Sequence, residues 1–542
     1  MKSFYKLLFA GLLANCVLLP GFSQSEDANE KLPKDYLTKE FHAGRRQALR
    51  DMMPANSVAV IFAYPELVFS KDVNYVYHPN PDLYYFSGYK EPNAVLLIFK
   101  EIQAAGDSSY NELFFVQHKD PLREQWTGKR LGVSGTKSKL GFKRVYNSDD
   151  FAKFPIDFKK FKTIVYDDLA DSVGTDASPG NLKDLVGAFR TKAAIHDMDK
   201  TLMATLNLIN TRITPQYLGR LVAFLKPKLS LDAFKNNDLV QEIVNKPDSA
   251  TLMDVKAKIN ANLPGPLLFG KYTTALRGVK TPEELVLLKK SIEISSIAHA
   301  EAMRAVKPQM SEAELEGIML YVHKHYGAED EGYPPIVGAG GNGCILHYEE
   351  NNMTEVGNQL VLMDVGAEYH GYSADVTRTF PANGKFTDEQ KAIYQLVYDA
   401  QEEVFKLCKQ GIPYSAVEAK ATEVLGAGLV KLGIIQTAED VHKYYPHGVS
   451  HHLGLDVHDK GDYSGNLISG MVITNEPGVY IPAGSPCDKK WWNIGVRIED
   501  DVLIGNDGGT WLSIDAPRKW QDVEKTIAEK SIFDEAKFPV LK

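Results

Sequence analysis

The stretch QLVLMDVGAEYHGYSADVTRTF, residues 359–380, contains two runs of β-forming residues on either side of a polar turn, AEYHG. We predict a β-hairpin centred between Tyr369 and His370. That register places Asp364 directly opposite Asp375. Side chains in such a pair lie ~5 Å apart, where like charges repel each other. Unless both aspartates lie on a solvated surface, a neighbouring arginine or a bound cation must balance them.

Two more carboxylates interrupt apolar strands further along the chain. GMVITNEPGVYIP, residues 470–482, predicts a strand that ends at Glu476 in a Pro-Gly turn. IGVRIEDDVLIG, residues 494–505, predicts a strand with Arg497 and Glu499 on the same face. Burying an unpaired glutamate in an apolar strand costs free energy, so both glutamates need a partner.

A histidine-rich stretch, HGVSHHLGLDVHD at 447–459, lies in the same half of the chain. His447 and His451 have the i, i+4 spacing of a zinc-protease helix, but two glycines and the lack of a following glutamate argue against a helix. We therefore predict an extended segment. His451 and His458 can then reach one cleft only if the chain kinks, and Gly454 is the expected place.

These residues suggest a metal site with five candidate ligands: Asp364, Asp375, His451, Glu476 and Glu499. Four carboxylates and one imidazole form a hard, oxygen-rich set, which suits Mn(II) or a similar divalent ion better than a thiolate-rich zinc site does. Two divalent ions balance the formal charge of the four carboxylates. Paired metals activate water for hydrolysis, so a hydrolytic reaction is expected.

Five motifs, in this order, resemble those of the Xaa-Pro aminopeptidases (aminopeptidase P) of the pita-bread metallopeptidase family M24: VGAGGNGCILHYEEN, LMDVGAEYHGYSADVTRTF, HGVSHHLGLDVHD, TNEPGVYI and GVRIEDD. Earlier stretches, including NPDLYYFSGYKEPNAVLLI and EQWTGKRLG, are similar to the N-terminal domain of that family. The resemblance implies an α/β and α+β protein. Its N-terminal creatinase/aminopeptidase P-like α/β domain would precede a C-terminal pita-bread catalytic domain.

We expect three parts along the chain: a signal peptide at 1–24, an N-terminal domain at 36–270 and a catalytic domain at 271–542. The N-terminal domain would include an extra helical segment at about 190–265, which the resemblance does not cover. The boundary rests on a Pro-Gly-Pro break at 264–266 and on a capping box that starts a helix after Thr281.

The resemblance assigns roles to the five ligands. Asp364 would bind one metal ion, Asp375 and Glu499 would bridge both ions, and His451 and Glu476 would complete the second.

Further catalytic roles follow from the same resemblance. Glu476 would also take a proton from the attacking water. His347, in a predicted CILHY strand, and His458 would contact the scissile carbonyl or the departing proline. His447 would line the pocket, and Arg497 would orient the bridging glutamate.

The expected activity is hydrolysis of the bond between an N-terminal residue and a following proline, through a hydroxide activated by two metal ions. Mn(II) is the favoured ion, with Zn(II) and Co(II) as alternatives, and the resemblance implies a homo-oligomer, either dimer or tetramer. Two rival functions are an Xaa-Pro dipeptidase (prolidase) and a non-catalytic peptide-binding protein on the same fold.

The first residues, MKSFYKLLFAGLLANCVLLPGFSQSEDANE, have the order of a secretory signal: lysines, then an apolar run, then small and polar residues. The apolar run is short for a membrane span, so we predict cleavage near Gln24 and export to the periplasm or the medium. The formal net charge of the 542-residue chain is −9, which indicates neither nucleic-acid binding nor a polybasic membrane patch.

Some residues have less certain meaning. Cys344, Cys408 and Cys487 fit no metal motif and are expected to be buried thiols. His452 stands where the family usually has an aromatic residue, a substitution that would alter the shape of the pocket without changing its ligands. Trp126 matches a first-domain position that could reach an active site, as does Asp72; for each, a packing or surface role is at least as well supported.

Overall fold

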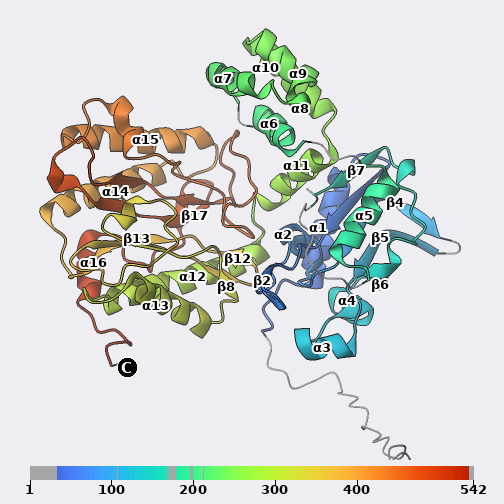
Figure 1. Ribbon diagram of the computed structural model, residues 1–542, viewed down its shortest axis with the longest axis horizontal. Helices are drawn as coiled ribbons and strands as arrows, with labels where there is room; N and C mark the ends of the chain where they lie inside the picture. Colours follow the sequence, from blue (N-terminus) through green and yellow to red (C-terminus); the bar gives the residue numbers. More distant parts are fainter. Residues whose placement is uncertain are drawn as a thin grey trace, which may run out of the picture. The chain divides into compact units, whose positions relative to one another are not determined.

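The computed structural model describes residues 33–105, 108–167, 169, 179–195, 199–211 and 213–535 (Figure 1). The predicted signal peptide lies outside these residues. Leu37–Lys542 form one compact unit, apart from Met1–Tyr36. Within the described residues, every helix is either too short or too polar to cross a lipid bilayer.

The first region is built on a five-stranded sheet with the order β6-β5-β4-β1-β7 (Figure 1). Its strands are β1 (Ser57–Phe62), β4 (Val95–Ala105), β5 (Ser108–Val116), β6 (Val145–Asn147) and β7 (Thr163–Tyr166). Strand β4 runs antiparallel to β1 and β5, whereas the edge strands β7 and β6 run parallel to their neighbours. Because side chains alternate along β1, Ala59 and Ile61 join one hydrophobic core, while Val58 and Val60 join another.

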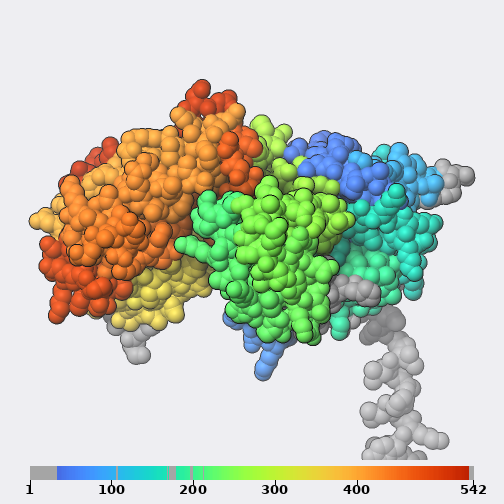
Figure 2. Space-filling view, turned by 90° about the horizontal axis from the view of Figure 1, so that it is seen from above, coloured from blue at the N-terminus to red at the C-terminus, as the bar shows by residue number. Residues whose placement is uncertain are grey.

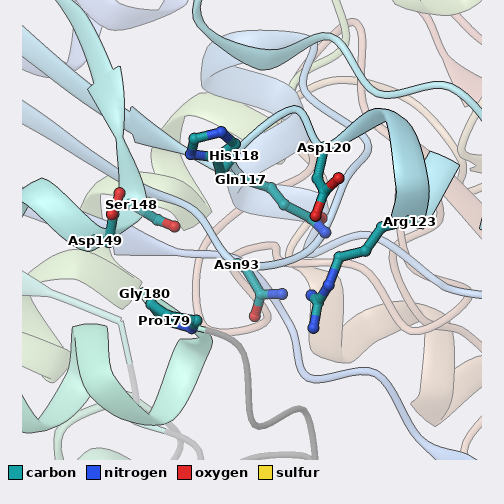
Figure 3. Close-up of a pocket in the computed structure, with 9 residues that line it drawn as sticks. All are labelled: Asn93, Gln117, His118, Asp120, Arg123, Ser148, Asp149, Pro179 and Gly180. Atoms are coloured by element: carbon teal, nitrogen blue, oxygen red, sulfur yellow. The ribbon is translucent and has the colours of Figure 1, made fainter. Parts of the chain in front are cut away.

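Helices cover both faces of this sheet. They are α1 (Lys39–Met52), α2 (Pro81–Ser87), α3 (Pro121–Thr127), α4 (Gly132–Leu140) and α5 (Leu182–Ala193). A short hairpin of β2 (Val68–Ser70) and β3 (Val73–Asn74) extends from the region. A cavity of about 240 Å³ lies where β5 and β6 end and α5 begins (Figure 3). None of the predicted site residues lines this cavity.

The predicted helical segment contains α6 (Lys200–Thr211), α7 (Leu218–Lys228), α8 (Asp232–Lys235), α9 (Asp238–Asn245) and α10 (Ser249–Ala261). These helices enclose a hydrophobic core of their own, which includes Leu225, Phe234 and Ile243. The predicted Pro-Gly-Pro break is instead the start of another helix, α11 (Gly265–Arg277), because proline is well tolerated in the first turn. Helix α11 packs on β7 and α1, so residue 270 lies within an element that belongs with the first region.

The second region repeats a pattern of two helices followed by strands. Helices α12 (Pro282–Ala305) and α13 (Glu312–His325) precede β8 to β13, and α14 (Asp388–Phe405) and α15 (Tyr414–Lys431) precede β14 to β18. Figure 1 shows the strands between the two helix pairs, and α16 (Trp520–Ile527) follows. The predicted capping box at Thr281 is present: its hydroxyl accepts from the Glu284 backbone, and the Glu284 carboxylate accepts from Thr281.

The site-bearing strands are short. They are β8 (Asp330–Glu331), β9 (Ile336–Ala339), β10 (Leu360–Asp364), β11 (Ala367–Tyr369), β12 (Tyr372–Ser373), β13 (Thr377–Pro381), β14 (Val472–Asn475), β15 (Gly478–Ile481), β16 (Ile494–Arg497), β17 (Asp500–Ile504) and β18 (Gly509–Trp511). They form three three-stranded sheets, β13-β10-β9, β12-β11-β8 and β14-β17-β18, together with the pair β15-β16.

The predicted register of the opening hairpin is wrong. The turn is centred between His370 and Gly371, which both have positive φ, as a two-residue hairpin turn of this kind requires. Asp364 therefore pairs with Thr377 and not with Asp375. The predicted AEYHG turn is also wrong in extent, because its first three residues form β11. Since side chains two residues apart share a face, Asp375 still lies on the same face as Asp364.

Two other local predictions need correction. His347 lies in a turn after a short 3-10 helix (Asn342–Cys344) and not in a strand. The histidine-rich stretch is neither helix nor regular strand: it bends repeatedly and makes a single β-bridge, between His452 and Ile473. Gly454 lies in this bent segment, in contact distance of Asp459 and Lys280, where a side chain would not fit.

Candidate metal and catalytic site

One cavity of about 430 Å³ in the second region is lined by every predicted site residue. These are His347, Asp364, Asp375, His447, His451, His458, Glu476, Arg497 and Glu499. They come from a turn, from the ends of β10 and β16, from the bent histidine segment, and from the residues between strands. Leu346, Gly448, Ser450 and Tyr463 complete the lining. The structure thus brings together residues that are up to 152 positions apart in the sequence.

Two aspartates meet at the hydroxyl of Tyr333. This hydroxyl lies 2.5 Å from Asp364 Oδ1 and 2.7 Å from Asp375 Oδ1. Tyr333 is half-buried, and its pKa is well above the usual range because of desolvation and the charges of both aspartates. It therefore keeps its proton and can donate it to one carboxylate at a time.

His451 lies between two of the carboxylates. Its Nε2 is 3.2 Å from Asp375 Oδ2 and 3.3 Å from Glu476 Oε1. Its Nδ1 lies 3.1 Å from the His452 carbonyl, which fixes the ring. One ligand atom each from Asp375, His451 and Glu499 fall within 4.8 Å of one another, close enough to share a metal ion.

Arg497 pairs with a different carboxylate from the one expected. Its Nη2 lies 2.6 Å from Asp364 Oδ2, whereas its Nε is 3.9 Å from Glu499 Oε2. Glu499 instead accepts a hydrogen bond from the Thr377 hydroxyl at 2.6 Å. Thr377 occupies this place because it is the β13 partner of Asp364. The predicted role of Arg497 as the residue that orients Glu499 thus has the weaker geometric support.

The electrostatics of the cluster show an excess of negative charge. Burial, followed by the charges of Asp375 and Glu476, raises the pKa of Glu499 well above its usual range. Burial and Asp364 raise the pKa of Asp375. Burial raises the pKa of Glu476 to about 7, although the nearby His451 acts against this shift. Arg497 and a protonated His451 carry two positive charges against four carboxylates, so the donor set fits divalent cations.

Two histidines of the cavity, His447 and His458, are neutral near pH 7. Burial lowers the pKa of His447 to about 4, and Arg497 adds to this effect. Burial and His451 lower the pKa of His458 to about 4. His447 Nε2 lies 2.8 Å from the Tyr480 hydroxyl, and the His458 ring meets the His451 ring edge-on at 4.4 Å. Neutral His458 can donate a hydrogen bond to a bound peptide, whereas the single N–H of neutral His447 is directed at the Gly448 carbonyl, 2.9 Å from Nδ1.

The charge of His451 predicts how the stability of the metal-free protein depends on pH. Burial lowers the pKa of His451, but the hydrogen bond with Asp375 and the charge of Glu476 outweigh burial and raise it to about 9. A raised folded-state pKa gives stability that is complete below the unfolded value of about 6.5 and is lost as pH rises through 9. We expect the metal-free protein to lose about 2 kcal/mol of unfolding free energy between pH 7 and 9.

Thermal unfolding of chelated protein across that range measures the effect. The His451→Gln variant should lose most of this pH dependence. A wild-type unfolding profile that is flat from pH 7 to 9 would show that His451 is not charged in the folded metal-free state.

Sequence reasoning missed several residues of the site. Tyr333 joins the two aspartates, Tyr480 accepts from Arg497 at 2.9 Å, and Thr377 holds Glu499. Asp501 accepts a hydrogen bond from the Asp375 backbone. Thr377 lies within the quoted DVTRTF motif. It could have been predicted from Asp375, because side chains two residues apart share a face of a strand. Tyr333 precedes two prolines in a turn, and no pattern signals its role.

Three uncertain residues are placed as follows. His452 is fully buried against Tyr414 and Tyr463 and does not line the cavity. Any effect of His452 on the shape of the pocket is therefore indirect, through neighbours such as Tyr463, which lines the cavity. Trp126 is 89% exposed on α3. Asp72 lies in the turn between β2 and β3.

Of the three cysteines within the described residues, only Cys408 is buried, while Cys344 and Cys487 are half-buried. The prediction of buried thiols is therefore wrong for two of them, although all three are free.

Comparison with known proteins agrees with this arrangement. Residues 286–506 match the model of metallopeptidase family M24, and residues 42–165 match the aminopeptidase P N-terminal domain. The chain is 33% identical to the Xaa-Pro aminopeptidase of Escherichia coli (strain K12), across 89% of this chain and 96% of that protein. It is 29% identical to the mitochondrial intermediate cleaving peptidase 55 of Arabidopsis thaliana, across 90% and 83%.

Solved structures give the same result. Aminopeptidase P from E. coli with the inhibitor Pro-Leu superposes with a TM-score of 0.69 at 30% identity, across 91% of this chain and 98% of that chain. Proline aminopeptidase P II from Yersinia pestis superposes with a TM-score of 0.66 at 30% identity, across 91% and 100%. The predicted fold class, an N-terminal α/β domain followed by a pita-bread domain, is confirmed.

Proposed function

The chain belongs to the Xaa-Pro aminopeptidases of metallopeptidase family M24 and is a proline-specific aminopeptidase, and from this premise we propose that it cleaves Xaa-Pro-Yaa peptides with two divalent metal ions at the carboxylate cluster. The observation that carries the proposal is the cluster itself: four carboxylates, three of them buried, and His451 line one cavity, with the pKa of Asp375, Glu476 and Glu499 all raised.

The metal ions would be held by Asp364, Asp375, His451, Glu476 and Glu499. Asp375 and Glu499 would bridge the two ions, Asp364 would bind the first, and His451 and Glu476 the second. When bound, such ions lower the pKa of a water molecule and polarise the peptide carbonyl. Mn(II) is the ion that we propose, because the donors are mainly oxygens.

Glu476 is the residue that we assign to proton transfer. It is half-buried, lies beside His451, and has a pKa raised to about 7 in the metal-free cavity, which is suited to both accepting and returning a proton. The prolyl nitrogen carries no hydrogen in the peptide, so the departing amine must receive a proton as the bond breaks. Glu476 can supply the proton that it took from the attacking water.

The rim histidines would hold the substrate. His347, His447 and His458 lie on the lining of the same cavity as the carboxylates, and His447 is fixed by Tyr480. As a neutral imidazole, His458 can donate a hydrogen bond to the oxyanion that forms at the scissile carbonyl.

A prolidase would accept only dipeptides and would need a cation for the free carboxylate of proline. Arg497 is the one arginine of the cavity lining, and it is already paired with Asp364 and Tyr480. A non-catalytic binding protein is disfavoured because all five candidate ligands are present. The aminopeptidase therefore has better support than either rival.

A peptide panel after chelation tests the proposal. The protein is stripped of metal, and Mn(II), Zn(II) or Co(II) is restored before cleavage of Xaa-Pro, Xaa-Pro-Yaa and Xaa-Ala-Yaa peptides is measured. We expect activity to disappear on stripping, to return best with Mn(II) at two ions per chain, and to favour Xaa-Pro-Yaa over both other peptides by at least 10-fold.

Preferential cleavage of the Xaa-Pro dipeptide would support the prolidase. Full activity in the stripped protein, or full activity at one ion per chain, would contradict the two-metal mechanism.

We also propose that the chain is exported after removal of residues 1–24 and that it forms a homo-oligomer. The amino-terminal lysines and apolar run support export. The exposed Leu122 and Trp126 on α3 and the exposed apolar residues of the β2–β3 hairpin support association between copies.

A further inference from the structure

The helical segment has an unusual distribution of charge. Residues 200–231 contain no aspartate or glutamate, although the whole chain has 70 of them among 542 residues. The same 32 residues contain five cations: Lys200, Arg212, Arg220, Lys226 and Lys228. The net charge of −9 therefore conceals a local stretch that is purely basic.

Helix α7 presents part of this stretch to solvent. Its inner face, which includes Leu221 and Leu225, packs into the core of the helical segment. Its outer face and the residues at its ends expose Tyr217 by 44%, Phe224 by 45% and Leu231 by 47%. Phe224 lies within α7, whereas Tyr217 and Leu231 flank its two ends. In Figure 2 the green surface belongs to this helical segment.

The cations of α7 lie among these apolar side chains. The Arg220 guanidinium is 5.9 Å from the centre of the Tyr217 ring, and Lys228 Nζ is 4.7 Å from that of Phe224. Lys226 is also exposed. Within the part of the chain that the structure describes, no carboxylate lies within ion-pair distance of Arg220, Lys226 or Lys228. No described carboxylate therefore compensates their charge.

We propose that this α7 face, defined by Tyr217, Arg220, Phe224, Lys226, Lys228 and Leu231, docks on the surface of an anionic lipid bilayer. Apolar side chains flanked by lysine and arginine match the boundary between acyl chains and charged headgroups. Each cation near an anionic surface contributes enough attraction to strengthen binding about fivefold. The contact lies on the bilayer surface, since no described helix can span it.

The lack of acidic residues favours a bilayer over a protein as the partner. A protein interface pairs individual charged residues and can contain both acidic and basic side chains. An anionic bilayer, in contrast, repels every exposed carboxylate on the face that approaches it. The aromatic residues agree with this choice, because tyrosine and phenylalanine bury rings at the headgroup level at a small entropic cost. The face also lies outside both family-matched segments, 42–165 and 286–506, so the peptidase reaction does not require it.

Vesicle flotation with the full chain tests the proposal. Vesicles of phosphatidylcholine alone are compared with vesicles that contain phosphatidylcholine and phosphatidylglycerol in equal amounts. We expect the wild-type protein to float with the anionic vesicles much more than with the neutral ones, and to be released as the salt concentration rises, because salt screens the attraction.

The triple variant Phe224→Ser, Lys226→Gln, Lys228→Gln removes one apolar side chain and two cations from the face. Its partition onto anionic vesicles should fall about 25-fold or more. A matched control, Val286→Ser, Lys289→Gln, Lys290→Gln, makes the same chemical changes on an exposed stretch of α12. The control should bind like wild type, and both variants should cleave a soluble Xaa-Pro-Yaa peptide at the wild-type rate.

Comparing variants of the full chain cancels any contribution from its apolar N-terminus. Equal binding by both triple variants would overturn the proposal, as would equal wild-type binding to neutral and anionic vesicles. If the α7 variant instead changes the sedimentation of the protein without vesicles, the face is a contact between copies and the bilayer proposal fails.

Discussion

The Glu476→Gln variant is expected to lose about 100- to 10,000-fold in kcat/KM for an Xaa-Pro-Yaa peptide while it keeps its fold. Glutamine retains one oxygen for a metal ion and can still accept from the Thr474 hydroxyl, which lies 3.1 Å from Glu476 Oε1. It cannot take a proton from water and return it to the prolyl nitrogen. The loss should therefore appear mainly in kcat, with KM little changed.

Steady-state kinetics after metal restoration measure this effect, and metal analysis shows whether the variant still binds its ions. Glu418→Gln is a suitable control: this glutamate accepts from the Val449 backbone at 2.7 Å but does not line the cavity. The control should retain activity within about 10-fold of wild type. If Glu476→Gln also retains activity in this range, Glu476 does not transfer the proton.

The carboxylate cluster was predictable from the sequence because strands have a period of two. The hairpin register was predicted incorrectly, since the left-handed residues His370 and Gly371 move the turn by one position. An error that moves one strand by two residues against the other leaves Asp364 and Asp375 on the same face. The prediction of proximity thus survived an incorrect prediction of pairing.

Prediction of the site from the sequence was least accurate where the backbone is irregular. The bent histidine segment follows no period, so the sequence could place His451 and His458 in one cleft only by assuming a kink. The carboxylate that Arg497 contacts depends on which strand residue pairs with Thr377. The period of two along a strand does not specify this pairing. Tyr333 reaches the cluster through tertiary packing alone. The resemblance selected residues that line one cavity, whereas the hydrogen bonds between them had to be seen in the structure.

The helical segment illustrates a different limit. Its helices were predictable from apolar spacing, but its structural independence was not, because a pattern of single helices does not say which core they share. The start of α11 was read as a domain break, since proline and glycine signal both a loop and a helix N-terminus.

The Asp375→Asn variant is expected to have opposite effects on activity and on the stability of the metal-free protein. Asparagine removes a proposed bridging ligand, so metal content should fall below two ions per chain and kcat/KM should fall at least 1000-fold. In the metal-free state, however, burial and Asp364 raise the pKa of Asp375, which shows that its charge is unfavourable there. At about pH 10, above the folded-state pKa of His451, this carboxylate has lost its charged partner, so the metal-free variant should unfold at a higher temperature than the metal-free wild type.

Thermal unfolding with and without Mn(II) separates the two effects, and Asp500→Asn provides a control of opposite sign. Asp500 is fully buried and lies 2.6 Å from Arg378, with further bonds from Ser513 and Gln401. Breaking this balanced pair should destabilise the protein by roughly 3–5 kcal/mol whether or not metal is present. Both aspartates are buried, so the difference between the two variants reports the charge balance around each aspartate.

A metal-free Asp375→Asn variant that is less stable than wild type would mean that Tyr333 and His451 already compensate the charge of Asp375. Mutual repulsion of the carboxylates would then not drive the binding of ions.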